Sequence, residues 1–214
     1  MALANNGPHG HFRGRIGNLV YYTLKGQQVV RVIGKSDKPP TDGQIKTWAE
    51  TKMCATILKY CKAVLEVGFS AEARGTTSNP FNMAMKCNRS TIIKGTFPEL
   101  SIDFSKLMLS KGDLKQAANW QVTEVSEGIR YSWDADPQMD WPEATDQVMM
   151  VAYFPGQEKA IYTLFGNSRL SGNDLLKLPA SLRGEHVQTY MAFVSADRKQ
   201  LSDSQYTGHF NTGK

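Results

Sequence analysis

The N-terminal forty residues constrain the fold most, because they combine apolar runs with positive charge and are too few to enclose a core. Six basic residues and one acid, Asp37, give this segment a charge of +5, equal to that of the whole chain. Two runs rich in β-branched and aromatic residues, 18–24 and 27–33, predict two strands joined by a turn at Lys25-Gly26. Residues 1–16 are expected to form an irregular, glycine-rich arm. An isolated hairpin is marginally stable in water, so we expect this basic β-arm to dock on the body of the protein or on another copy.

Alternation along the first predicted strand places apolar side chains on both of its sides. Leu19 and Tyr21 point one way, and Val20, Tyr22 and Leu24 the other. A ribbon with two apolar faces favours insertion between other elements over lying in a DNA groove.

Two helices are expected next. Pro39-Pro40 breaks the strand pattern, and Thr41 or Asp42 is a good N-cap for a helix that runs to about Val67. Gly68 is a natural C-cap. Asn79-Pro80 then opens a second helix that ends at Gly95, and the short loop between the helices predicts an antiparallel pair.

After Pro98 the chain takes on the pattern of short strands separated by turns. The predicted strands are 107–109, 120–125, 129–133, 148–153, 160–165, 186–194 and 201–206. This spacing predicts an antiparallel β-sandwich. We therefore expect an α+β protein with two domains: residues 1–112 (arm, hairpin and helical pair) and residues 113–214 (sandwich).

Composition favours a globular cytoplasmic protein. Hydrophobic residues make up 41% of the chain, which is ordinary for a protein that builds a core. No apolar run reaches the roughly 20 residues that cross a bilayer, and no secretory signal is recognised, although export without a signal stays open. The cysteines, Cys54, Cys61 and Cys87, lack CxxC spacing and indicate free thiols in a reducing compartment, with Cys54 and Cys61 as buried residues on one helix face.

No catalytic, metal or cofactor motif stands out. Gly34-Lys35-Ser36 resembles the end of a P-loop, but Val29 occupies the position that the motif reserves for glycine. His9 and His11 lack a third ligand, and the Asp134 to Asp140 loop lacks the EF-hand glycine and distal glutamate. The GxSxG turn of serine hydrolases is absent. We therefore expect no metal, no cofactor, no identifiable small-molecule substrate and no enzymatic activity. An enzyme of unknown type is kept as a third hypothesis, after the two given at the end of this subsection.

A second charge bias lies between residues 119 and 150, where seven acids accompany Arg130 alone. This segment is a possible acceptor for the basic arm of a neighbouring copy. Its candidate residues are Asp134, Asp136, Asp140, Trp141 and Asp146.

The C-terminal part resembles a fibronectin type III domain. Residues 122–137 (VTEVSEGIRYSWDADP) look like the first two strands of that family, with Trp133 in the core. Residues 186–208 (HVQTYMAFVSADRKQLSDSQYTG) look like its last hairpin, with Tyr190 as the core tyrosine. The resemblance implies a scaffold and no particular activity.

The whole chain also resembles a family of uncharacterised Bacteroidota proteins known only as a domain of unknown function. The motifs that carry this resemblance are GRIGNLVYYTLKGQQVVR (14–31), Pro39-Pro40-Thr41 with Gln44, Gly68-Phe69, Phe81-Asn82, IDFS (102–105), LSKG (109–112) and FVSADRKQLSDS (193–204). Arg15 and Tyr21-Tyr22 depart from the family pattern. The resemblance implies a fold and a lineage, and no activity.

The function we expect is that of a structural or interaction protein that self-associates through its N-terminal β-arm. The donor residues are Arg13, Arg15, Tyr21, Tyr22, Lys25, Arg31 and Lys35. Contact between unlike patches would give rings or filaments. The alternative is a nucleic-acid-binding protein in which the same arm neutralises phosphates. No membrane partner is expected.

Overall fold

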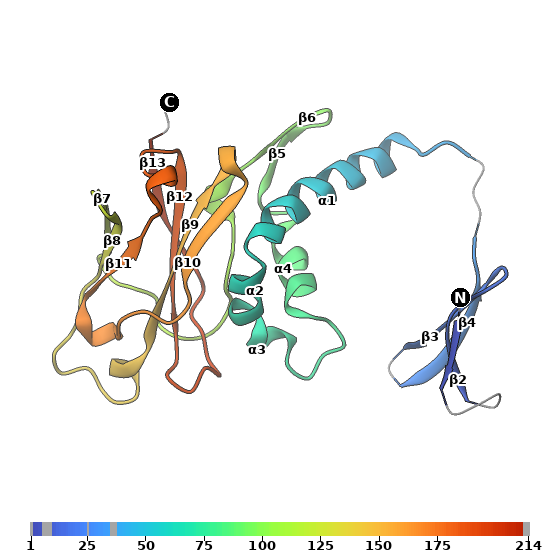
Figure 1. Cartoon of the computed structure of the whole chain (residues 1–214), viewed down its shortest axis with the longest axis horizontal. Coiled ribbons are helices and arrows are strands. Elements are labelled where there is room, and N and C mark those ends of the chain that lie inside the picture. The colour runs from blue at the N-terminus through green and yellow to red at the C-terminus, as the bar shows by residue number, and fades with distance from the viewer. Residues whose placement is uncertain (1, 6–9, 25, 35–37, 212–214) are drawn as a thin grey trace. The chain divides into compact units, whose positions relative to one another are not determined.

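The computed structural model describes residues 2–5, 10–24, 26–34 and 38–211 (Figure 1). The chain separates into two compact units, residues 1–44 (unit 1) and 45–214 (unit 2). The domain boundary predicted at residues 112/113 therefore lies inside unit 2. Among the described residues, no helix is long and apolar enough to cross a membrane.

Unit 1 is a four-stranded antiparallel sheet in the order β1-β2-β3-β4. Its strands are β1 (Ala2–Asn5), β2 (His11–Ile16), β3 (Leu19–Leu24) and β4 (Gln27–Val32). The predicted hairpin is confirmed as β3 and β4, but the prediction of an irregular arm before it is wrong. Sequence propensity missed β2 because its HFRGRI segment contains a glycine and two arginines, and the ladder with β3 holds it extended.

Glycines make the two described turns of this sheet possible. Gly17 has a φ of +57° between β2 and β3, and Gly26 has a φ of +81° between β3 and β4. Only glycine adopts such angles at low cost, so both positions fix the register of β3 against its neighbours.

Four helices follow: α1 (Asp42–Tyr60), α2 (Lys62–Gly68), α3 (Ser70–Ala73) and α4 (Pro80–Asn88). The predicted first helix begins as expected, because Thr41 and Gln44 form a capping box with bonds of 2.9 and 3.4 Å. It is interrupted at Cys61, whose backbone (φ −97°, ψ 15°) leaves the helical region. The second predicted helix is capped by Asn79, whose side chain accepts a 2.8 Å bond from the Asn82 N–H, but it ends at Asn88 rather than at Gly95.

A short hairpin, β5 (Ile93–Thr96) and β6 (Glu99–Ile102), and a 3-10 turn, η1 (Phe104–Lys106), come next. Residues 107–109 do not form the predicted strand. Leu107 and Leu109 are buried there, and the buried Asn88 side chain donates to the Met108 carbonyl and accepts from the Met108 N–H, each at 2.8 Å. An extended, apolar segment thus looks like a strand in sequence while side chains satisfy its backbone.

Seven strands build the two remaining larger sheets. They are β7 (Gln121–Val125), β8 (Gly128–Ser132), β9 (Gln147–Phe154), β10 (Lys159–Thr163), β11 (Asn173–Lys177), β12 (Val187–Val194) and β13 (Gln205–Phe210). One sheet has the order β11-β8-β7 and the other β10-β9-β12-β13. Five strand predictions match this pattern closely, the last is shifted toward the C-terminus, and β11 was missed.

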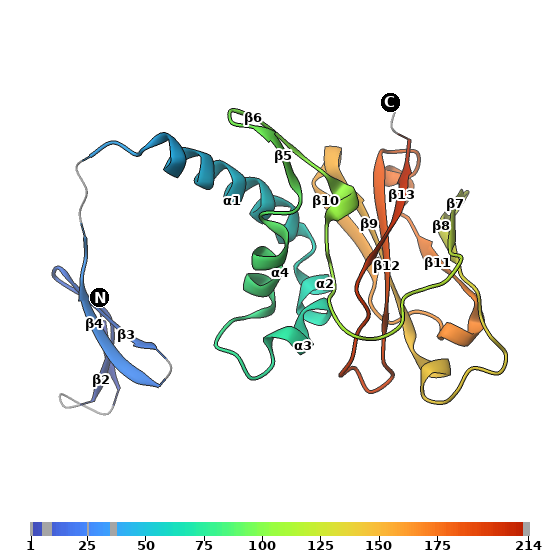
Figure 2. The same ribbon diagram turned by 180° about the vertical axis from the view of Figure 1, so that it is seen from behind.

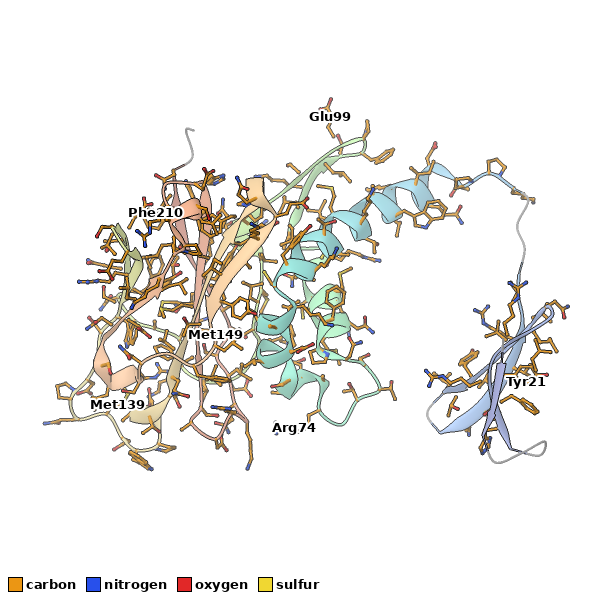
Figure 3. The ribbon with its side chains drawn as sticks, viewed as in Figure 1. Tyr21, Arg74, Glu99, Met139, Met149 and Phe210 are labelled. Carbon is orange, nitrogen blue, oxygen red and sulfur yellow. The ribbon has the colours of Figure 1, made fainter. Side chains whose placement is uncertain are left out.

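The four-stranded sheet of unit 2 is covered on both faces (Figures 1 and 2). Met149, Val151 and Tyr153 share a core with the helices, whereas Met150, Ala152 and Phe154 share a second core with β8 and β11. Figure 3 shows Met149 among these side chains. Every residue of β12 is buried, so this strand lies in the middle layer of three.

Gly68 ends α2 for a reason other than the predicted one. Its φ is not positive, but an added Cβ would lie 2.1 Å from the Leu109 carbonyl oxygen. The Lys111 N–H also donates to the Gly68 carbonyl at 2.9 Å. The glycine therefore allows the helices to touch the segment that leads into the sheets.

Candidate functional site

The register of unit 1 sorts its side chains into two unlike faces. Arg15 pairs with Val20, and Val20 pairs with Arg31, so these three lie in one row across β2, β3 and β4. Alternation adds Arg13, Tyr22 and Val29 to the same side. All three arginines are exposed. We call this side the arginine face: Arg13, Arg15, Val20, Tyr22, Val29 and Arg31.

The opposite side carries no charged residue on the described parts of β2 to β4. Gly14, Tyr21 and Val30 form one row and Ile16, Leu19 and Val32 the next. The Phe12 and Tyr21 rings lie 5.7 Å apart. We call this side the apolar face: Phe12, Ile16, Leu19, Tyr21, Val30 and Val32. The expectation of two apolar faces is thus corrected, because cross-strand pairing adds β2 and its arginines to one side only.

Among the described residues from 10 to 44, none is buried. Val30 is 52% exposed, Val32 60% and Ile16 46%. Tyr21 and Tyr22, expected together in the donor site, lie on opposite faces (Figure 3 labels Tyr21). Lys25 and Lys35 lie outside the described residues. The sheet therefore offers two separate surfaces for contact.

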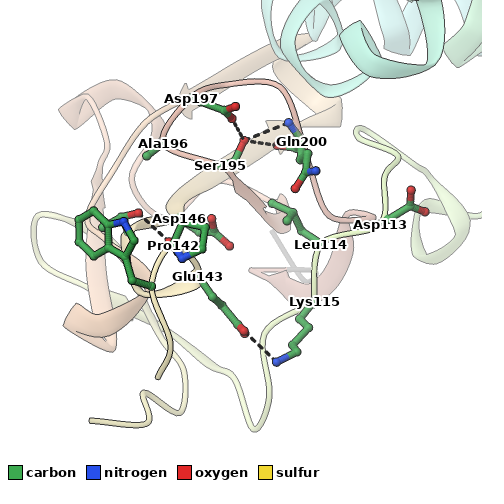
Figure 4. Close-up of a pocket in the computed structure, with 12 residues that line it drawn as sticks. Asp113, Leu114, Lys115, Pro142, Glu143, Asp146, Ser195, Ala196, Asp197 and Gln200 are labelled. Carbon is green, nitrogen blue, oxygen red and sulfur yellow. Dashed lines mark hydrogen bonds and ion pairs between the residues drawn. The ribbon is translucent and has the colours of Figure 1, made fainter. Parts of the chain in front are cut away.

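A pocket of 570 Å³ lies among three loops of unit 2 (Figure 4). We call it the loop pocket. Its walls come from residues 113–115, from the loop before β9 and from the turn after β12. Trp141, 80% exposed, forms one wall with Pro142. The predicted acceptor segment therefore does contribute to a concave surface.

The carboxylates around this pocket are largely engaged. Glu143 pairs with Lys115 at 2.8 Å, and Asp197 accepts from the Ser195 hydroxyl at 2.6 Å. Asp136 accepts from the Gln138 N–H at 2.8 Å. Asp136 and Asp140 lie together near Glu143, whereas Asp134 accepts from Asn119 elsewhere on the loop.

Asp146 is not part of an exposed acceptor patch. It is 3% exposed and its Oδ2 lies 3.3 Å from Nη2 of Arg169, which is 4% exposed. Burial raises the pKa of Asp146, although the neighbouring Arg169 opposes the shift, and burial lowers the pKa of Arg169. Alternation and charge counting could not reveal this, because Asp146 follows one short 3-10 turn and Arg169 begins another, and the burial of such turns depends on the sheets around them.

Arg169 connects several segments and was missed by the sequence analysis. Its Nη2 donates to the Lys115 carbonyl at 2.7 Å, and its guanidinium lies 3.8 Å from the centre of the Phe193 ring. The Trp133 indole donates to the Arg169 carbonyl at 2.7 Å and packs edge-on against Phe193. The buried Nε of Arg169 has no hydrogen-bond partner among the described residues. The contacts make Arg169 a structural centre below the loop pocket.

A second hollow, of 490 Å³, runs beside α1 in unit 2. We call it the helix groove. Its walls are mainly apolar, with Lys52 and Glu158 also present: Ala49, Met53, Ile57, Ile102, Phe104, Tyr153 and Pro155. Ile45 and Trp48, 36% and 60% exposed, lie about two turns and somewhat more than one turn before Met53 on the same helix. The stripe therefore continues the apolar wall toward the start of α1.

Cys54 and Cys61 are fully buried, as predicted, and Cys87 is partly buried. Burial raises the pKa of Cys54 to about 11 and of Cys61 to about 12, which keeps both as thiols. Within the described ranges, no group of three histidine, cysteine or acidic side chains is arranged to hold a metal ion.

These features define a mixed α+β protein. Along the chain, an N-terminal antiparallel sheet is followed by a helical region and then by several antiparallel sheets. The sequence profile of a family of unknown function, DUF6266, matches residues 11–208, so the chain belongs to that family. The predicted membership of such a family is confirmed. No curated protein and no solved structure matches the chain.

Proposed function

We propose that this is a non-enzymatic structural or interaction protein that self-associates through its N-terminal sheet. The observation that carries this proposal is the uncovered apolar face, where Val30 and Val32 are more than half exposed. The hydrophobic face of a sheet is stable in water when it is buried against another element. A cover supplied by another copy of the chain would provide that burial.

The rest of the chain fits the role of a scaffold. The strand order β7-β8-β11 opposite β10-β9-β12-β13 supports a sandwich of the fibronectin type III kind, as proposed from the sequence. Such a sandwich is a general framework and implies no reaction. A cytoplasmic location and an origin in the Bacteroidota stay predictions.

The acceptor for the arginine face is a second part of the proposal. Asp136, Asp140 and Trp141 keep this role, since all three are exposed. Trp141 lines the loop pocket, and Asp136 and Asp140 line a hollow that shares Lys115 and Glu143 with it. Charge reversal at Asp136 and Asp140 tests it: association should weaken at low salt and change little at high salt. Unchanged association at low salt would show that Asp136 and Asp140 are not the acceptor.

Removal of residues 1–44 tests the main proposal. Both buried clusters lie within unit 2, so residues 45–214 retain the cores that hold them folded. We expect the full chain to form oligomers and residues 45–214 to be monomeric, as measured by light scattering coupled to size-exclusion chromatography. A full chain that stays monomeric at about 100 μM would contradict the proposal, because stable assemblies have dissociation constants well below that concentration.

A matched pair of point variants localises the effect. Val30→Asp places a charge on the apolar face, whereas Gln27→Asp places one on the opposite side of the same strand. Val30→Asp should weaken association at least about tenfold, since a buried unpaired carboxylate is costly. Gln27→Asp should change it little.

Nucleic-acid binding is the second candidate, and the arginine face favours it. Three exposed arginines share one side of the sheet with Tyr22, a combination that suits phosphates and stacked bases. Binding of single-stranded DNA that weakens steeply with salt, and that falls in the Arg13→Ala/Arg15→Ala variant, would support it. Equally weak DNA binding by the wild type and by the Arg13→Ala/Arg15→Ala variant would argue against a nucleic-acid-binding function.

A further inference from the structure

The apolar face of unit 1 and the helix groove of unit 2 are similar in chemistry and in length. Both are lined mainly by uncharged, partly exposed side chains. A six-residue strand is about 20 Å long. The helical stripe from Ile45 to Ile57 rises about 18 Å. The two surfaces can therefore lie along one another over their full length.

We propose that the apolar face of one copy packs into the helix groove of a second copy, and that the exchange is reciprocal. This inference rests on the proposed self-association and names the surface that receives the sheet. Trp48 extends the contact beyond the groove. Large aromatic side chains of this kind dominate the energetics of protein interfaces.

The size of the surfaces favours this arrangement over direct stacking of two sheets. Three strands of six residues, about 20 Å long, and the four-residue strand β1, about 13 Å long, lie about 4.8 Å apart and give each face a footprint of roughly 350 Å². Sheet-to-sheet contact would thus bury about 350 Å² per copy, less than half of the roughly 800 Å² per partner in a stable complex. In a reciprocal exchange each copy contributes both a sheet face and a groove, and the area per partner doubles to about 700 Å², which lies within the range of stable complexes.

The charge distribution agrees with the same choice of face. Burial of the arginine face in the helix groove would remove three guanidinium groups from water against a wall in which Glu158 is the one carboxylate among the described lining residues. Packing through the apolar face leaves these arginines outward. They remain free to meet acidic groups or phosphates.

The connection between the units is long enough for an exchange. Unit 1's last strand ends at Val32 and α1 begins at Asp42, so nine residues join them. Nine residues span at most about 30 Å. A sheet can therefore reach a neighbouring copy while its own helix stays in place.

Disulfide trapping tests the contact. In a Cys87→Ala background, one population carries Val30→Cys on the apolar face and another carries Met53→Cys in the groove. On mild oxidation, the mixture should form a cross-linked heterodimer, and neither population alone should cross-link. Arg31→Cys replaces Val30→Cys in the matched control, since Arg31 is the next residue of β4 and lies on the opposite face. It should give less than about one tenth of the product, because a disulfide requires Cα atoms within about 7 Å.

Each other result overturns the proposal. Dimers from Val30→Cys alone would indicate direct stacking of two sheets. A disulfide within one chain of the double variant Val30→Cys/Met53→Cys at high dilution would place the sheet on its own groove. A full chain that associates but yields no Val30–Met53 product would leave the self-association standing and remove the groove, whereas a monomeric full chain would remove both.

A second measurement does not depend on cross-linking. Trp48→Ala removes a side chain that is 60% exposed, so the fold of unit 2 should be unaffected. We expect the dissociation constant of the dimer to rise at least about tenfold, because tryptophan is among the side chains that contribute most to protein interfaces. Unchanged dissociation by analytical ultracentrifugation would contradict the role of the groove. Leu170→Ala, at another exposed site of unit 2, is the control.

Discussion

The N-terminal sheet and the four-stranded sheet of unit 2 share the same antiparallel ladder but differ in what covers them. In unit 2, β9 and β12 are almost wholly buried between helices and a second sheet. In unit 1, none of the described residues from 10 to 44 is buried. Antiparallel hydrogen bonding between strands is thus present in both sheets, while hydrophobic burial among the described residues is present in one. Burial supplies most of the favourable free energy of folding, so unit 2 contains the source of its own stability, whereas the described residues of unit 1 bury almost no apolar surface.

Thiol reactivity should give the largest contrast between the units. Val30→Cys in unit 1 should react with a thiol reagent nearly as fast as a free thiol when the chain is dilute. Cys54 and Cys61 should react at least about a thousandfold more slowly, because they are buried and their reaction needs opening of unit 2. Mass spectrometry of the labelled peptides measures the rates. Cys87 serves as a partly buried native reference. Rapid labelling of Cys54 would contradict the expected difference in reactivity between the two units.

Truncation of one phenylalanine in each unit should separate the units energetically. Phe193 is fully buried between Trp133 and the Arg169 guanidinium, and Phe193→Ala should lower the free energy of unfolding by about 3–5 kcal/mol. Phe12→Ala should leave the main unfolding transition unchanged, because that transition reports on unit 2. Urea unfolding followed by tryptophan fluorescence measures both. A comparable loss in Phe12→Ala would mean that unit 1 contributes to the same cooperative core.

The polar clamp at Asn88 should matter more than the helix cap at Asn79. Asn88→Ala leaves the N–H and carbonyl of Met108 without their partner in a buried region, at a cost of about 2–3 kcal/mol. Asn79→Ala removes one exposed capping bond, at a cost of about 1 kcal/mol. Thermal and urea unfolding of both variants check the order. A reversed order would show that the segment 107–109 is held by apolar packing rather than by Asn88.

The pH dependence of unit 2 should show the smallest effect. The raised folded-state pKa of Asp146 means that the folded chain binds this proton more readily than the unfolded chain. The resulting stabilisation is fully present below the ordinary pKa of 3.8 and is lost as pH rises through the folded-state pKa. Relative to Asp146→Asn, the wild type should therefore gain stability as pH falls from 7 toward 4.

Asp197 provides a control of opposite sign. Its hydrogen bond from Ser195 lowers its pKa, so its contribution is present above the ordinary pKa and is lost as pH falls through the lowered value. Relative to Asp197→Asn, the wild type should lose stability in strong acid. Urea unfolding between pH 3 and 7 compares the three proteins. The same sign for both variants would contradict the environment found for Asp146.

Local signals in the sequence predicted the elements that depend on a few neighbouring residues. Thr41 with Gln44, and Asn79 before Pro80, mark helix starts because caps act within one turn. Gly26 marks the β3–β4 turn because positive φ is a property of a single residue. Strands β7, β8, β9, β10 and β12 were found because their side chains are β-branched or aromatic. The prediction failed at β2 and β11, whose residues have little intrinsic strand preference and which are extended by pairing.

The candidate site divides in the same way. The order of the residues is enough to show that a positively charged segment with apolar runs lies before Pro40, and that Trp141 lies among acidic residues. Folding was needed to bring the arginines to one face of a sheet, to bury Asp146 against Arg169, and to place α1 beside an open groove. Each of these requires residues from several strands or loops to meet, and cross-strand register and burial are fixed by packing between segments far apart in the chain.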